Sequence, residues 1–147
     1  MQMAFASTFS FYLKAHKFHW NVEGDDFPQY HSLFGKIYEE VYGCVDGFAE
    51  RIRTLGVYMP GSYTEFSMLS KIADATNGNP TYMEMVKQLA VDNASMETIL
   101  KFAYDKAEAA GKHGLSNFLA ERMDAHAKHG WMLKACLVEE PEEDMED

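Results

Sequence analysis

The segment HKFHWNVEGDDFPQYH, residues 16–31, contains the end of one predicted helix, a break and the start of the next. Apolar side chains recur at helical spacing over residues 4–21, and the GDDFP run then interrupts the pattern. Pro28 suits the first turn of a second helix over residues 27–55, for which Asp26 is the expected cap. The segment therefore predicts two long helices joined by a short turn.

The rest of the chain continues the helical pattern and shows almost no strand-like alternation. The segment between the second and third helices is long enough for a crossover, and part of it is expected to be a short helix. The fold class is therefore all-α, a four-helix bundle with one long crossover. We expect one domain, residues 1–138, followed by an acidic tail, residues 139–147. The predicted helices cover residues 4–21, 27–55, 81–110 and 115–138, with the short helix inside residues 62–74.

Four potential metal ligands accompany the first two helices. His19 and His31 lie on either side of the turn, while Asp46 and Glu50 are spaced so that they share one face of the second helix. Histidine nitrogen and carboxylate oxygen are donors that divalent iron or zinc accepts. The motif Glu-x-x-His, through which helical bundles hold a pair of iron atoms internally, does not occur in the sequence.

The four residues cannot form one site within a single chain. At about 1.5 Å per residue, His31 and Asp46 lie roughly 22 Å apart along a continuous helix, whereas metal ligands converge to about 2 Å. A common site requires antiparallel helices from two copies, with a two-fold axis near residues 38–41 and two sites per dimer. The alternative is two unrelated pairs, one of histidines and one of exposed carboxylates.

The charge and composition of the chain exclude some partners. Thirteen basic and twenty-three acidic residues give a net charge of -10. The first thirteen residues contain no lysine or arginine, so there is no electrostatic basis for an arm that binds nucleic acid. No apolar run reaches the roughly 18 residues of a membrane span. Only Cys44 and Cys136 are present, which indicates reduced thiols in a cytoplasmic protein.

Several segments together resemble one family over nearly the whole chain. They are KFHWNVEG at residues 17–24, FPQYH at 27–31, DGFAERIRTLG at 46–56 and LAERMDAHAKHGWMLKACL at 119–137. The ordered set resembles the mini-ferritins, the Dps proteins of starved cells. The resemblance implies a ferritin-like four-helix bundle that assembles into a hollow homo-oligomeric shell, a dodecamer built from dimers.

The resemblance also implies an activity. Family members are ferroxidases, oxidoreductases that oxidise ferrous iron with peroxide or dioxygen, store ferric mineral and protect against oxidative stress. On this likeness His19 and His31 are the metal ligands of one subunit, and Asp46 and Glu50 are those of its partner. Trp20 matches a tryptophan beside that centre, where packing at the interface is favoured over electron donation.

The sequence departs from the family pattern just after the second histidine. Acids proposed to nucleate mineral are replaced there by Ser32, Gly35 and Lys36, which leaves Glu39 and Glu40 as candidates.

Two other functions remain open. One is a nucleoid protein that compacts DNA, and the other is a shell that binds zinc or another non-redox metal. His126 lies on the apolar stripe of the last helix, so we expect a hydrogen-bonded core histidine there and not a metal ligand.

Overall fold

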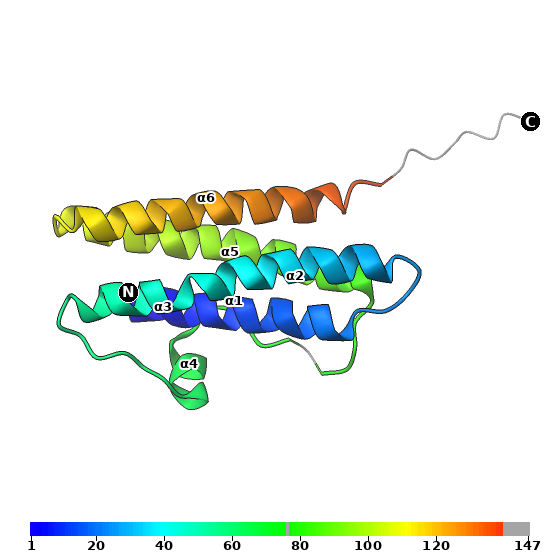
Figure 1. Ribbon diagram of the computed structural model, residues 1–147, viewed down its shortest axis with the longest axis horizontal. Coiled ribbons are helices and arrows are strands. Elements are labelled where there is room, and N and C mark those ends of the chain that lie inside the picture. Colours follow the sequence, from blue (N-terminus) through cyan, green and yellow to red (C-terminus); the bar gives the residue numbers. More distant parts are fainter. Residues whose placement is uncertain (76, 140–147) are drawn as a thin grey trace, which may run out of the picture.

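The computed structural model describes residues 1–75 and 77–139, and within them every regular element is a helix. The long helices lie side by side in a bundle, with a small helix on its flank (Figure 1). The elements are α1 (Gln2–Asn21), α2 (Phe27–Gly43), α3 (Val45–Arg53), α4 (Tyr63–Leu69), α5 (Tyr82–Ala109) and α6 (His113–Ala135). α3 continues the direction of α2, and α4 lies in the long crossover to α5. The predicted all-α bundle is therefore confirmed.

The second predicted helix is not continuous, which corrects the expected span 27–55. It is interrupted at Cys44, whose backbone N–H bonds the carbonyl of Val41 at 3.2 Å, three residues back. Glycine in a helix interior is unfavourable by about 1 kcal/mol relative to alanine, and Gly43 precedes the break. A Cβ added at Gly43 would meet no atom within 4 Å in the described part of the chain. Gly43 is therefore not closely packed by any described residue of this chain.

The turn between α1 and α2 also differs in one detail. Asp26 occupies the N-cap position of α2, but its side chain accepts no capping hydrogen bond. Its backbone carbonyl instead accepts from the N–H groups of Gln29 and Tyr30 at 3.1 and 3.2 Å. Pro28 lies in the first turn, as expected.

The connection between α5 and α6 has the hydrogen bonds of a Schellman motif. The N–H of Lys112 bonds the carbonyl of Ala107 at 2.9 Å, and that of Gly111 bonds Glu108 at 3.0 Å. Gly111 has φ of 69°, a backbone conformation that favours glycine. α6 begins at His113, directly after this turn, and ends at Ala135. Both bounds are earlier than those of the predicted helix, 115–138.

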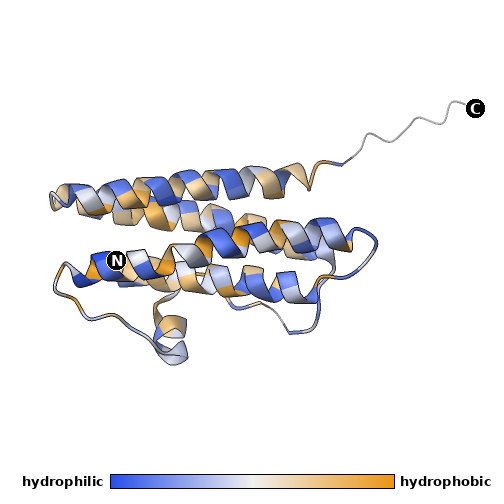
Figure 2. Cartoon of the chain, in the orientation of Figure 1, coloured by the Kyte–Doolittle hydropathy of each residue, from blue (hydrophilic) through white to orange (hydrophobic). Residues whose placement is uncertain are grey.

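The core lies between α1, the consecutive helices α2 and α3, α5 and α6. Fully buried side chains come from every long element, among them Phe11, Phe18, Phe34, Phe48, Leu89, Leu100, Leu119 and Leu133. Burial of each such side chain contributes about 1.5–3 kcal/mol. Hydrophilic and hydrophobic residues alternate along each helix (Figure 2). Within the described residues, no helix is both long and apolar enough for a membrane span. The predicted tail, apart from Glu139, lies outside the described residues.

Candidate metal centre

His19 on α1 and His31 on α2 meet where these two antiparallel helices lie against each other. The Nδ1 atom of each imidazole is 2.7 Å from the backbone carbonyl oxygen of the other residue. The two rings stack with centroids 3.7 Å apart. Gly35 leaves the space for this arrangement, because a Cβ there would lie 3.1 Å from the His19 ring. The packing of α1 against α2 therefore brings these two predicted ligands together within one chain.

The reciprocal hydrogen bonds determine which nitrogen is available. A backbone carbonyl can only accept, so Nδ1 of both His19 and His31 must carry the proton and donate. Each Nε2 is left with a lone pair, the form in which imidazole binds a metal. Hydrogen bonds of this kind orient metal-binding histidines in proteins and raise their basicity. The pair therefore fits a divalent metal ion.

Asp46 and Glu50 lie one turn apart on α3, and both are exposed. Figure 1 shows α3 at the end of the bundle opposite the α1–α2 connection. His19 lies near the end of α1 and His31 near the start of α2, on either side of that connection. Among the described residues, no three His, Cys, Asp or Glu side chains group closely enough to hold a metal ion. The four predicted ligands thus form two separated halves, an imidazole half and a carboxylate half.

Aromatic residues surround the histidine pair, and most of them were not predicted from the sequence. His16 stacks on Tyr38 with ring centroids 3.7 Å apart, and the ring of Trp20 lies 3.9 Å from that of His16. The Tyr12 hydroxyl is 3.0 Å from Nδ1 of His16. Burial raises the pKa of Tyr12. The spacing of Tyr12 and His16, one helical turn, was the signal available in the sequence.

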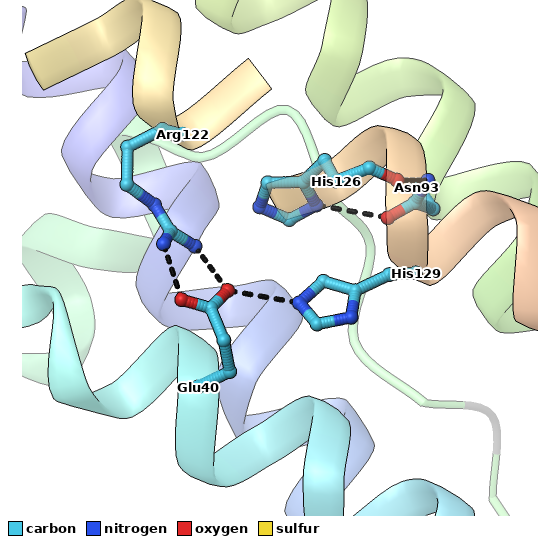
Figure 3. Close-up of polar contacts among 5 residues, drawn as sticks. All are labelled: Glu40, Asn93, Arg122, His126 and His129. Atoms are coloured by element: carbon cyan, nitrogen blue, oxygen red, sulfur yellow. Dashed lines mark hydrogen bonds and ion pairs between the residues drawn. The ribbon is translucent and has the colours of Figure 1, made fainter. Parts of the chain in front are cut away.

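A second polar cluster lies inside the bundle (Figure 3). Glu40 of α2 accepts hydrogen bonds from two nitrogens of Arg122 at 2.5 and 2.8 Å and from Nε2 of His129 at 2.8 Å. Next to it, Nδ1 of His126 donates to the side-chain carbonyl of Asn93 at 2.8 Å, and the Asn93 amide donates to the His126 backbone. His126 is a hydrogen-bonded core residue, as expected.

This cluster changes the role expected for Glu40. Burial alone would raise the pKa of Glu40, but hydrogen bonds from His129 and Arg122 outweigh that effect and lower it to about 2. A carboxylate held by these two partners is not a free site for mineral nucleation, so that expectation is wrong for Glu40. Burial and the charge of Arg122 lower the pKa of His126 to about 3, which keeps its imidazole neutral.

The architecture and comparisons with known proteins define the class. A bundle of long helices with one long crossover is a ferritin-like fold, and a family model described as the ferritin-like domain matches residues 1–141. Among solved structures, Dps from Staphylococcus aureus superposes with a TM-score of 0.89 at 31% identity, over 95% of this chain and 93% of that one. Dps from Bacillus brevis gives a TM-score of 0.88 at 31% identity, over 93% and 91%.

Relatives that are similar in sequence show which family of ferritin-like proteins the chain belongs to. The DNA protection during starvation protein of Brevibacillus brevis is 33% identical over 86% of this chain and 84% of its own length. The general stress protein 20U of Bacillus subtilis is 32% identical over 86% of each chain. The chain belongs to the Dps family of ferritin-like proteins.

Proposed function

We propose that the protein is a ferroxidase and iron-storage mini-ferritin that acts in the cytoplasm. Ferrous iron, the substrate, is bound by His19 and His31 of one subunit and by Asp46 and Glu50 of a second subunit. Peroxide or dioxygen oxidises it, and the ferric product is stored inside a dodecameric shell, which protects against oxidative damage. The observation that carries this proposal is the histidine pair, whose reciprocal hydrogen bonds leave both Nε2 atoms unprotonated.

The donor set suits iron that changes its oxidation state. Negative carboxylates stabilise the ferric product more than the ferrous reactant, so such a site favours oxidation. Mixed nitrogen and oxygen ligands that leave coordination positions open also admit the oxidant. No acid–base or nucleophilic residue is needed for this chemistry.

The separation of the two halves supports a site shared between subunits. A second copy, related by a two-fold axis near residues 38–41, would bring its carboxylates to the histidines of the first. Exposed apolar side chains on α1 and α4 support a subunit interface on the surface that these two helices form. Leu13 and Trp20 of α1 and Met68 of α4 line a groove of about 670 Å³ between the two helices. Trp20 is 59% exposed in the single chain.

Complementation between two inactive variants tests the shared site. We expect neither His19→Ala/His31→Ala nor Asp46→Asn/Glu50→Gln to form ferric ion rapidly, as followed by near-ultraviolet absorbance after anaerobic addition of ferrous ion and then peroxide. If the variants are unfolded together and refolded at equal amounts, half of the random dimers are mixed, and each mixed dimer has one intact site. The mixture should therefore recover about a quarter of the wild-type initial rate.

A control variant tests whether the loss of activity is specific to the four residues. The variant His113→Ala, which removes an exposed histidine far from the pair, should retain the wild-type rate. Recovery absent from the mixture, although both variants assemble as the wild type does, would show that the four residues do not form one shared site. Rapid oxidation by either unmixed variant would show that its missing residues are not ligands.

The name of the Brevibacillus brevis relative, DNA protection during starvation protein, suggests DNA protection as a second function. A net charge of -10 opposes direct binding to a phosphate backbone. A plasmid gel shift at low salt tests this function, and we expect no shift. The same ferric absorbance assay separates a ferroxidase from a shell that binds only zinc or another non-redox metal.

A further inference from the structure

A continuous set of aromatic rings leads away from the histidine pair along α1 and α2. The ring of Tyr38 lies 5.0 Å from that of His19, centroid to centroid, and stacks on His16 at 3.7 Å. Tyr12 follows, with its hydroxyl 3.0 Å from Nδ1 of His16. From the candidate metal centre to Tyr12, each ring is thus in contact or hydrogen-bonded with the next.

Tyr12 differs from the other tyrosines in the partner of its hydroxyl. Oxidation of a phenol releases its proton, so a tyrosine is most easily oxidised where a base accepts that proton. Within the described residues, Tyr12 is the tyrosine whose hydroxyl meets an imidazole nitrogen. The Tyr38 hydroxyl reaches only an exposed carboxylate of Glu39 at 3.4 Å, and that of Tyr30 donates to the sulfur of Met83.

We infer that Tyr12 and His16 form a proton-coupled electron donor to the iron centre. This inference rests on the proposed ferroxidase function. When peroxide meets a site that holds a single ferrous ion, reduction of the O–O bond needs two electrons and the iron supplies one. Tyr12 supplies the second through His16 and Tyr38, and Nδ1 of His16 takes the phenol proton.

The step balances in atoms and electrons. One ferrous ion, one peroxide molecule, neutral Tyr12 and neutral His16 give one ferric ion, two hydroxide ions, a neutral Tyr12 radical and protonated His16. The O–O bond of peroxide and the O–H bond of Tyr12 break, and an N–H bond forms on His16. The consequence is that the second oxidising equivalent is held on a tyrosine and is not released as hydroxyl radical.

Freeze-quench electron paramagnetic resonance tests the inference on the assembled protein. Ferrous ion is added anaerobically at no more than one per candidate site, followed by one equivalent of peroxide, and the organic radical and ferric signals are recorded together. Incorporation of ring-deuterated tyrosine should narrow the radical signal, which distinguishes tyrosine from Trp20. Loading with excess ferrous ion should abolish the radical, because iron then supplies both electrons.

Two variants and a matched control decide which residues act. Tyr12→Phe keeps the ring but removes the hydroxyl, and His16→Phe keeps a ring against Tyr38 but removes the proton acceptor. Both should lose the radical signal while ferric ion still forms. The control Tyr30→Phe removes the hydroxyl of another half-buried tyrosine and should retain the full signal.

The remaining outcomes are also decisive. A wild-type protein that forms ferric ion without an organic radical contradicts the inference and leaves the ferroxidase function intact. A radical of undiminished intensity in Tyr12→Phe contradicts it in the same way, since the electron then comes from another residue. Failure of the wild type to form ferric ion at all would instead reject the proposed function on which the inference rests.

Discussion

Replacing Glu40 with glutamine is expected to destabilise the bundle by about 2 kcal/mol. The substitution removes the charge that neutralises Arg122, whose side chain is only 7% exposed. The drop in the pKa of Glu40 from 4.5 to about 2 corresponds to ~3 kcal/mol at about 1.36 kcal/mol per pKa unit. Glu40 is 38% exposed, so water screens part of that interaction, and about 2 kcal/mol remains.

Urea unfolding followed by circular dichroism measures this difference, with all variants at one protein concentration because assembly also stabilises the fold. A loss of about 2 kcal/mol would lower the melting temperature by roughly 4–8 °C in a chain of this size. The neighbouring exposed acid supplies the matched control, Glu39→Gln, which should change stability by less than about 0.5 kcal/mol. In the double variant Glu40→Gln/Arg122→Met, no uncompensated charge remains, so part of the loss should be recovered.

The pH dependence provides an independent check of the sign. The pKa of Glu40 is lower in the folded protein than its ordinary value of 4.5, so its contribution is fully present above about pH 4.5. The contribution is lost as the pH falls toward about 2. The stability difference between wild type and Glu40→Gln should therefore shrink over this window. An equal urea midpoint for both proteins at neutral pH, or a difference that grows on acidification, would refute the assigned role of the ion pair.

Three further substitutions test other contacts. Gly35→Ala places a Cβ 3.1 Å from the His19 ring, so the initial rate of ferric formation should fall severalfold. The free energy of unfolding in urea should change by less than about 1 kcal/mol, because alanine favours the helix. Asn93→Ala removes both hydrogen bonds to His126 and leaves its buried N–H without a partner, so unfolding in urea should require ~2–3 kcal/mol less. Thr81→Ala removes the N-cap of α5 and should lower the free energy of unfolding by about 1 kcal/mol in a thermal melt.

Each of these three results can contradict its premise. An unchanged oxidation rate in Gly35→Ala would show that the ring position of His19 does not matter to the reaction. Wild-type stability in Asn93→Ala would mean that water replaces the lost hydrogen bonds. For Thr81→Ala, Thr81→Ser is the matched control, and it should remain close to wild type because serine caps equally well.

Local patterns predicted most of the fold. Helical periodicity and the GDDFP turn located the long helices, because amphipathic spacing and turn residues act within a few positions of each other. The break at Cys44 was not predictable in this way. Cys44 keeps nearly helical dihedral angles, with φ of -92° and ψ of -11°, so the apolar spacing on either side is hardly disturbed. The unused cap at Asp26 depends on a side-chain conformation that spacing does not determine.

Local patterns likewise predicted only part of the candidate site. Spacing alone indicated that His31 and Asp46 cannot meet in one chain, since that conclusion needs only the rise of a helix. The bonds between His19 and His31 depend on how α1 lies against α2. The partners of Glu40 come from α6, more than eighty residues away in sequence. Tertiary packing determines contacts of that kind, and no local sequence pattern predicts them.

The single-residue interruption at Cys44 joins α2 to α3, which carries Asp46 and Glu50. Successive residues in a helix are rotated by about 100° around the axis. An insertion or deletion of one residue at this joint would turn the carboxylates of α3 by that angle, with α2 left in place. The proposed shared site therefore depends on the number of residues between His31 and Asp46.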